Sequence, residues 1–304
     1  MKKAETKKGS PLVSVILVTM NRKDILENCL RSVQKQTMPD VEIIVVDNGS
    51  GDGTGDMVRS LFPEVRCYYR NANLGPPAGR NYGVRMSKGE FCVFLDDDAV
   101  FADDDALNRV VSYFRSDKLL GCIAFRILKP GEGSEEYKSI PRADKKTISG
   151  DYECSYFCGA GFACRRGLFL DMRMFWEPLF IIAEELDFSY RLVNKGFKIL
   201  RSSAISVIHY ETPQARVPGK WIYFGIRSHC WVAVRNLPWI NVITHILLWW
   251  GYYFISAFRN RHPIWFILGV KDAVAGFLQA LEGRACISGE TMQKLKTLSG
   301  RVYY

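Results

Sequence analysis

The stretch Phe91-Cys92-Val93-Phe94-Leu95-Asp96-Asp97-Asp98-Ala99 joins an apolar run directly to three consecutive carboxylates. The apolar run predicts a buried strand, so the aspartates lie where this strand leaves its sheet. Open α/β sheets bind their ligands at this carboxyl edge. Three adjacent carboxylates repel one another unless a cation or hydrogen bonds compensate, and a divalent ion that also binds a diphosphate is one such compensation. The alternative is a solvated turn or a helix N-cap.

Upstream of this stretch, three further strands alternate with helices. Strands are predicted at 12–19, 41–46 and 65–69, and helices at 24–36, 54–61 and 78–87. The resulting order, β-α-β-α-β-α-β, is typical of an α/β fold with a mainly parallel, Rossmann-like sheet and helices on both faces. The strand ends at Thr19–Arg22, Asp47–Asn48 and Asp96–Asp98 then converge on one edge. The first strand is followed by Thr19-Met20-Asn21-Arg22 in place of a GxGxxG turn, which argues against a dehydrogenase.

The second half of the chain adds further elements around a polar insertion. We expect helices at 105–115 and 184–194, and strands at 121–128, 197–200 and 204–208, the last of which ends at His209. Residues 129–157 are polar and predict a mobile connection or a loose hairpin near the site. The small residues of Gly159-Ala160-Gly161 allow the backbone to approach a ligand closely.

Composition and charge indicate the setting of the protein. The 304 residues are 48% hydrophobic and 24% charged, with a formal net charge of +9, which is typical of a globular chain. Residues 1–10 are rich in lysine and predict a flexible basic tail, because they are too polar for a signal peptide. Nine cysteines, an odd number, favour a reducing compartment over a disulfide framework. No motif typical of nucleic-acid binding accompanies the basic balance, so we expect no nucleic-acid partner.

Beyond Lys220 the chain becomes rich in Trp, Tyr and Phe, interleaved with arginine and lysine. The stretch 238–258 is about long enough to cross a bilayer, but polar residues interrupt it. We therefore expect the helices of 237–304 to lie in a membrane interface, with arginines near anionic lipid. A spanning hairpin within 238–281 is the second choice, and a soluble appendage or a homo-oligomer interface is the third.

Four sequence blocks, taken in order, resemble the family 2 glycosyltransferases with the GT-A fold, and are similar to the rhamnosyltransferase-like members of bacterial polysaccharide and glycolipid assembly. The resemblance covers about residues 13–236. The blocks are SVILVTMNR at 14–22, IIVVDNGSGDGT at 43–54, NLGPPAGRNYG running to FLDDD at 73–98, and AEELDFSYRLVNKG at 183–196 followed by His209. Four blocks in order are more specific than any one of them alone.

The resemblance implies a nucleotide-diphospho-sugar donor, a divalent cation (Mg²⁺ or Mn²⁺) and inversion at the anomeric carbon. It assigns Asp98 and Asp96 to the metal, with Asp96 or Asp97 also near the ribose, and it places His209 as a further metal ligand. Considered alone, His209 is more simply a strand-end histidine that bonds to backbone. Of the three aspartates, Asp97 has the weakest claim to a direct role.

Inversion by a single displacement requires a base that takes the proton of the acceptor hydroxyl. The resemblance places this base at Glu185, where the family commonly has Asp, and leaves Glu184 and Asp187 as alternatives. On a helix, Glu184 and Asp187 share one side while Glu185 points elsewhere. Acids in a first helical turn are also explained by the helix dipole alone. Arg191, one turn later, is a candidate partner of Glu184 or Asp187.

For the nucleotide, the resemblance assigns residues from three loops of the first half. Thr19, Asn21 and Arg22 lie near the base or ribose, Asp47 lies on the base edge, and Asn73, Gly75 and Arg80 follow base, ribose and diphosphate. Arg80 has a physical reason for this place, since a guanidinium matches phosphate oxygens. A solvated helix arginine is the alternative.

These expectations combine into one function. We predict a metal-dependent inverting glycosyltransferase that moves a sugar to a hydroxyl of a glycan or lipid-linked acceptor in cell-surface polysaccharide assembly, at the cytoplasmic face of the membrane. Residues 11–128 form the nucleotide-sugar-binding half, 129–236 the acceptor-binding half and 237–304 the membrane-associated helices. The alternative is a non-catalytic nucleotide-sugar-binding subunit of a membrane glycan-assembly complex.

Overall fold

The computed structural model describes residues 10–212 and 217–300, so the tail expected at 1–10 lies outside the described residues except for Ser10. The first half comprises β1 (Val13–Thr19), α1 (Lys23–Gln34), β2 (Val41–Asp47), α2 (Thr54–Leu61), β3 (Arg66–Tyr69), α3 (Gly75–Met86) and β4 (Phe91–Asp96). The predicted alternation of strands and helices is confirmed. Helix α3 begins three residues earlier than expected because its two prolines occupy the first turn, where no backbone N–H is needed.

The middle of the chain returns to the same sheet several times. It comprises β5 (Ala99–Phe101), α4 (Ala106–Ser116), β6 (Leu120–Leu128), the 3₁₀ turn η1 (Tyr137–Ser139), β7 (Tyr152–Cys154), β8 (Gly161–Arg165), α5 (Arg166–Asp171), the 3₁₀ turn η2 (Glu177–Leu179), α6 (Glu184–Asn194) and β9 (Lys198–His209). The two strands expected at 197–200 and 204–208 are one irregular strand, since the pairing of β9 with β6 shifts register between them. The C-terminal part comprises α7 (Lys220–Asn236), α8 (Trp239–Arg259), α9 (Pro263–Ala275), α10 (Phe277–Glu282) and α11 (Gly289–Thr297).

Within the described residues, nine strands form one sheet with the order β3-β2-β1-β4-β8-β6-β9-β5, and β7 pairs with β9. Strands β3, β2, β1 and β4 are parallel, as predicted from the β-α-β order. Strand β8 is antiparallel to β4 and β6, whereas β6 and β9 are parallel. The regions 11–128 and 129–236, expected as two halves, therefore share one sheet.

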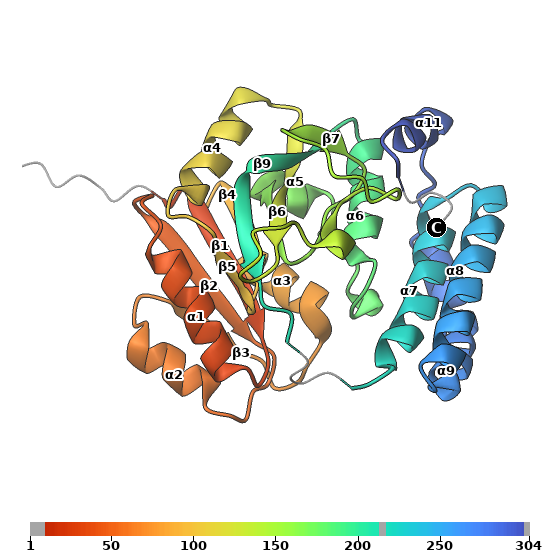
Figure 1. Ribbon diagram of the computed structural model, residues 1–304, viewed down its shortest axis with the longest axis horizontal. Coiled ribbons are helices and arrows are strands. Elements are labelled where there is room, and N and C mark those ends of the chain that lie inside the picture. Colours follow the sequence, from red (N-terminus) through yellow and green to blue (C-terminus); the bar gives the residue numbers. More distant parts are fainter. Residues whose placement is uncertain (1–9, 213–216, 301–304) are drawn as a thin grey trace, which may run out of the picture.

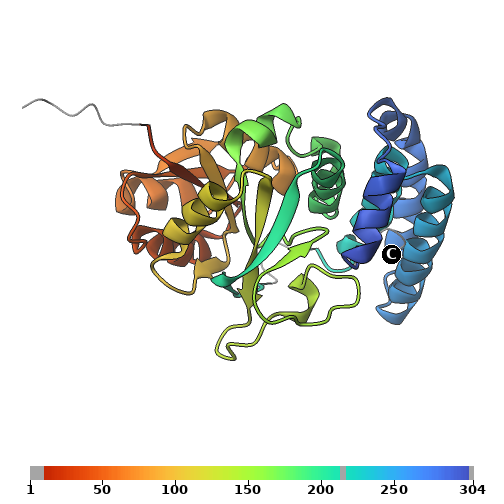
Figure 2. The same ribbon diagram turned by 90° about the horizontal axis from the view of Figure 1, so that it is seen from above.

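Helices cover both faces of the sheet, as Figure 1 shows. One apolar core contains the inward residues of α1, α2 and α4, and the other contains those of α3, α5 and α6. The two views agree that α7, α8 and α9 form a separate layer beside α6, away from the sheet (Figures 1 and 2). Helix α11 returns toward the sheet, where its Lys294 pairs with Glu153 of β7 at 2.7 Å. The structure is thus a three-layer α/β fold with a helical layer attached at one side.

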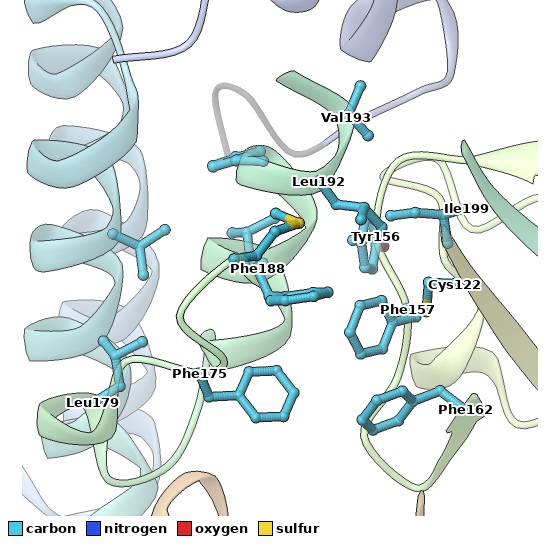
Figure 3. Packing of buried hydrophobic residues seen from close by; sticks show 14 of the residues in the cluster. Cys122, Tyr156, Phe157, Phe162, Phe175, Leu179, Phe188, Leu192, Val193 and Ile199 are labelled. Atoms are coloured by element: carbon cyan, nitrogen blue, oxygen red, sulfur yellow. The ribbon is translucent and has the colours of Figure 1, made fainter. Parts of the chain in front are cut away.

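An aromatic cluster fixes α6 against the sheet. Phe157 and Phe162 face Phe175 and Phe188 in Figure 3, and Phe188 lies on α6. The rings of Phe157 and Phe162 are 4.5 Å apart between centroids, and those of Phe175 and Phe188 are 5.6 Å apart. Aromatic pairs at such distances stabilise a core beyond the area they bury. This packing sets where the acidic first turn of α6 meets the end of β4.

The C-terminal helices pack on α7 and expose a broad apolar surface. Trp231 of α7 donates to the carbonyl of Ala273 on α9 at 3.0 Å, and Gly225 of α7 lies against the ring of Tyr253 on α8. In the described ranges no helix, including α8 and α9, is long and apolar enough to cross a bilayer. Thirteen of the 21 exposed large hydrophobic residues lie on α8, α9 and α10, which makes this surface the most apolar part of the described exterior.

Candidate active site

The loop after β1 is bonded to the middle aspartate of the triplet. The hydroxyl of Thr19 donates to Asp97 at 2.7 Å, and the guanidinium of Arg22 pairs with both Asp97 and Asp98, the second contact being 3.0 Å. Burial raises the pKa of Asp97 to about 6, although Arg22 opposes this shift. Asp97 and Arg22 therefore hold the ends of β1 and β4 together. Arg22, expected near the nucleotide, contacts carboxylates in this structure.

Asp96, Asp98 and His209 form a group that fits a divalent cation. One oxygen from each aspartate and one ring nitrogen lie within 4.8 Å of one another. Nε2 of His209 is buried and 3.2 Å from Asp98, but it is not aligned for a hydrogen bond with it. Two carboxylates and an unbonded imidazole nitrogen are donors that Mg²⁺ or Mn²⁺ accepts. The structure thus brings together the three residues that the sequence assigned to a metal.

The pKa values of His209 and Asp98 depend strongly on each other. Burial alone would lower the pKa of His209, but Asp98 and Glu136 raise it to about 10. Burial would raise the pKa of Asp98, but His209 and Arg22 hold it well below its usual range. The protonated imidazole therefore balances these carboxylates, as a metal cation would do after displacing the proton.

Arg80 of α3 joins this group to the acids of α6. Its guanidinium is buried and lies 2.7 Å from Asp96, 3.3 Å from Glu184 and 3.7 Å from Glu185. It also donates to the carbonyl of Gly159 at 3.0 Å. Arg80 was expected along the diphosphate. In the structure it contacts three carboxylates and lies between the cation group and the acidic first turn of α6.

The three acids of α6 differ in their access to the site. Asp187 is fully buried and pairs with Arg191 at 2.8 Å and with Arg235 of α7 at 3.2 Å, which keeps its pKa low despite burial. Glu184 is buried beside Arg80. The side chain of Glu185 is 18% exposed, so it is the acid of this turn that can reach a substrate. Arg191 therefore partners Asp187 and supports the fold.

Glu185 faces a cavity of about 190 Å³ at the boundary between the sheet and the helical layer. Its wall includes Ser139 of η1, Tyr156, Phe157 and His229 of α7. Burial and the neighbouring charge of Glu184 raise the pKa of Glu185. A carboxylate with a raised pKa in a small cavity has the properties of a general base.

The loops that follow β1 and β2 are held by hydrogen bonds that their side chains accept from backbone amides. Asn21, which has a positive φ of 53°, accepts a hydrogen bond from the amide of Gly51 at 2.8 Å. Asp47 is buried and accepts from the amide of Ser50 at 2.8 Å. The ends of β1 and β2 therefore form one rim, as the sequence predicted.

The start of α3 lies against the segment that precedes α6. Asn73 accepts from the amide of Gly75 at 2.9 Å, and Gly75 has a φ of +82°. A Cβ at this position would lie 2.0 Å from the carbonyl oxygen of Phe180, so glycine is required. The side-chain amide of Asn48, which follows β2, donates to the carbonyl of Gly75 at 3.2 Å and joins the start of α3 to the rim.

Three residues of the site were missed by the sequence reasoning. Glu136 bonds to His209, Thr212 pairs with Arg22, and His229 lines the cavity. Glu136 lies in the polar insertion, which has no periodic pattern, and His229 lies within the region expected to bind the acceptor but was not singled out there. The ion pair of Arg201 with Glu135, at 2.5 Å, ties this insertion to β9 and could not be inferred from either residue alone.

Two curated glycosyltransferases are similar to this chain in sequence. A protein from Campylobacter jejuni, GalNAc(5)-diNAcBac-PP-undecaprenol beta-1,3-glucosyltransferase, is 31% identical over 183 residues, which are 56% of each chain. The glycosyltransferase AglE of Haloferax volcanii is 32% identical over 45% of this chain and 47% of its own. The chain thus spans about half the length of these curated relatives.

Solved structures support the fold. The mannosyltransferase PcManGT from Pyrobaculum calidifontis, in complex with GDP-Man and Mn²⁺, matches with a TM-score of 0.57 and 20% identity over 98% of this chain and 82% of that one. TarS 1-349 from S. aureus matches with a TM-score of 0.63 and 17% identity over 96% and 88% of the chains. Both likenesses confirm the predicted GT-A fold.

The sequence profile of glycosyl transferase family 2 matches residues 14–173, which include β1 to β4, the three aspartates, Arg80 and the polar insertion. The matched region covers more than half of the 304 residues. The acids of α6 and His209 lie beyond it: His209 reaches the same edge as the last residue of β9, and Glu184 and Glu185 of α6 meet it through Arg80. On this evidence the chain belongs to glycosyl transferase family 2.

Proposed function

We propose that this protein is a metal-dependent, inverting glycosyltransferase that moves a sugar from a nucleotide-diphospho-sugar to a hydroxyl of a glycan or lipid-linked acceptor. One observation carries the proposal: Arg80 joins the group that fits a cation, through Asp96, to Glu185, which faces a cavity. The residues proposed to bind the donor and the base proposed to act on the acceptor are therefore adjacent. Membership of the family supports the reaction class.

On the donor side, Asp96, Asp98 and His209 would hold Mg²⁺ or Mn²⁺. When bound, the ion supplies positive charge to the leaving diphosphate. Arg22 and Asp97 keep the end of β4 in place, and the rim residues of β1, β2 and α3 would bind the nucleoside; they are Thr19, Asn21, Asp47, Asn73 and Gly75. The Mn²⁺ and GDP-Man in the PcManGT complex are consistent with this arrangement.

On the acceptor side, Glu185 takes the proton of the acceptor hydroxyl. The hydroxyl oxygen then forms a bond to the anomeric carbon while the bond from that carbon to the diphosphate oxygen breaks. A single displacement of this kind inverts the configuration. Arg80 offsets part of the negative charge of Glu184 and Asp96, and the charge of Glu184 together with burial still raises the pKa of Glu185.

We also propose that the acceptor is linked to a lipid and that transfer occurs at the cytoplasmic face of the membrane, during assembly of a cell-surface glycan. The Campylobacter relative carries PP-undecaprenol in its name, which supports a lipid-linked acceptor. The exposed apolar surface of α8 to α10 supports a place at a membrane. In this proposal, residues 11–128 serve the donor, 129–236 the acceptor and 237–304 the membrane.

A donor survey tests the function. The full chain is incubated with UDP-, dTDP- and GDP-sugars, with Mn²⁺, Mg²⁺ or EDTA, and release of the nucleoside diphosphate is measured. We expect slow hydrolysis of one donor class, which membrane lipid extract accelerates and EDTA stops. A chain that binds a donor but turns over none, with or without extract, would instead be a non-catalytic nucleotide-sugar-binding subunit.

A further inference from the structure

Glu136 lies in the connection between β6 and β7, yet it contacts the group that fits a cation. Its Oε2 is 3.0 Å from Nδ1 of His209, and Nε2 of the same ring is 3.2 Å from Asp98. One nitrogen of the imidazole thus faces Glu136 and the other faces the two aspartates. The ring itself lies at the end of β9, with its side chain 11% exposed.

The backbone around Glu136 is fixed by the sheet. The amide of Glu136 donates to the carbonyl of Ile127 at 2.8 Å, and Glu135 forms a bridge with Leu128. The carboxylate of Glu135 pairs with Arg201 of β9 at 2.5 Å, with both side chains buried. A buried, well-paired ion pair next to Glu136 restricts where its side chain can go.

We propose that Glu136 is a positioning residue for the metal, acting through His209. Its carboxylate accepts a hydrogen bond from Nδ1–H, which leaves the Nε2 lone pair directed at the cation and holds the ring in that orientation. This inference rests on the proposed metal dependence. Histidine ligands commonly donate their second ring N–H to a carboxylate, and loss of that partner costs about 10–100-fold in metal affinity.

The position of Glu136 also connects the two sides of the site. The turn η1 follows it directly, and Lys138 and Ser139 of that turn line the cavity that Glu185 faces. The segment that supports the metal ligand on one side therefore forms a wall of the acceptor cavity on the other. Metal binding should steady this wall because His209 and Glu136 are held together.

Mn²⁺ binding to the full chain tests the proposal without donor or acceptor. Free Mn²⁺ is followed by electron paramagnetic resonance for wild type, Glu136→Ala, Glu136→Gln and Glu132→Ala, which changes an exposed acid in the same segment. We expect Glu136→Ala to weaken Mn²⁺ binding about 10–100-fold and Glu136→Gln to weaken it less, since an amide oxygen still accepts. Glu132→Ala should bind as wild type does.

Two further observations separate positioning from a loss of structure. With Mg²⁺ bound, ¹⁵N-histidine NMR should show His209 as the Nδ1–H tautomer in wild type and a mixture in Glu136→Ala. Equal Mn²⁺ affinity of Glu136→Ala and Glu132→Ala would overturn the role of Glu136 and leave the proposed function standing. If Glu136→Ala does not fold, Glu136→Met, which fills the same space but cannot accept a hydrogen bond from Nδ1–H, takes its place, and a Mn²⁺ affinity equal to that of wild type overturns the role in the same way. No Mn²⁺ binding by wild type would overturn both.

Discussion

Among the acids of α6, Glu185 is distinguished by its access to the cavity, because Glu184 and Asp187 are buried in ion pairs. We predict that Glu185→Gln lowers kcat for sugar transfer about 10²–10⁴-fold, since the hydroxyl proton loses its acceptor. Donor affinity should stay within about twofold, as measured by calorimetry with the nucleoside diphosphate and Mn²⁺. Glu282→Gln, which changes an exposed acid of α10, is the control. Full transfer by Glu185→Gln would show that another group is the base.

Replacing Asp98 should impair metal binding, whereas replacing Glu185 should impair the transfer step. Asp98 lies within the cation group, where it faces both His209 and Arg22. We predict that Asp98→Asn weakens Mn²⁺ binding more than tenfold and removes the dependence of turnover on added metal. The measurement is a Mn²⁺ titration of activity and of binding in the same preparation. Unchanged Mn²⁺ affinity in the folded variant would remove Asp98 from the ligand set.

The pH profile reports on Glu185 in a second way. A base acts only when it is deprotonated, so transfer falls as the pH drops through its pKa. Burial and the charge of Glu184 raise the pKa of Glu185, so the acid limb should lie above the ordinary glutamate value of about 4.3. Glu184→Gln should move that limb to lower pH, because one negative neighbour is lost. An acid limb that stays in place in Glu184→Gln would contradict this assignment.

Residues that follow a strand or start a helix could be predicted for the site, and residues in irregular segments could not. The run of β4 into Asp96–Asp98, the acidic first turn of α6 and the histidine at the end of β9 each carry a local pattern, and the structure brings them together. Glu136 and Thr212 reach the site from segments without periodicity. Their contacts depend on how distant parts of the chain meet, which no local pattern records.

At the scale of elements, the parallel half of the sheet could be predicted more fully than the rest. Strands β1, β2 and β4 are near-continuous apolar runs, β3 is short and partly exposed, and the alternation of all four with helices implies parallel neighbours. Strand β8 inserts between β4 and β6 in the antiparallel direction, which composition does not indicate. The short strand β5 was missed because its three residues are too few for a periodic signal.

The contact between α6 and α7 depends on one buried carboxylate. Asp187 pairs with Arg191 and Arg235 and accepts from Asn236 at 2.8 Å. We predict that Asp187→Asn lowers the free energy of unfolding by about 3–5 kcal/mol, because the change leaves Arg235 and Arg191 buried or half-buried without their anion. Urea unfolding at neutral pH measures this. Asp56→Asn, which breaks an exposed pair with Arg59, should change it by less than about 1 kcal/mol.

Asp187 also makes the stability of the contact between α6 and α7 depend on pH, and the direction of this dependence follows from its pKa. The pKa of Asp187 is lowered in the folded state, so its contribution to stability is present above the unfolded value of about 3.9 and is lost as the pH falls through the folded value. The stability difference between wild type and Asp187→Asn should therefore shrink in acid. A difference that is constant down to the acid transition would show that packing, and not charge, holds α6 to α7.

At the scale of the whole molecule, helices α8 and α9 lie on the side of the molecule away from the sheet (Figures 1 and 2), and with α10 they carry most of the exposed large hydrophobic residues. Exposed residues recur along α8 at helical spacing, with Ile243, Leu247 and Ile255 between 56% and 67% exposed. Residues 239–271 contain Arg259, Arg261 and Lys271 and no Asp or Glu. Asp272 of α9 and Glu282 of α10 follow this range, so the acid-free part of the surface comprises α8 and α9 up to Lys271. An apolar face that carries cations without acids is complementary to an anionic bilayer surface. It suits a helix layer lying in the interface better than a surface for a second protein chain, where charges of both signs are usual.

We therefore predict that the full chain binds vesicles of phosphatidylglycerol and phosphatidylcholine and that α8 forms the contact. In co-sedimentation, Leu247→Gln with Ile255→Gln should release most of the protein, because both side chains are 67% exposed and would lie in the acyl boundary. Arg259→Gln and Arg261→Gln should each weaken binding by about 1 kcal/mol, roughly fivefold, and added salt should have the same effect. Leu61→Gln with Leu119→Gln changes exposed apolar residues of the sheet domain and should leave binding unchanged. If the α8 variants bind vesicles as wild type does, or if wild type instead forms dimers that the same changes dissociate, the surface serves association between copies of this chain and not a membrane.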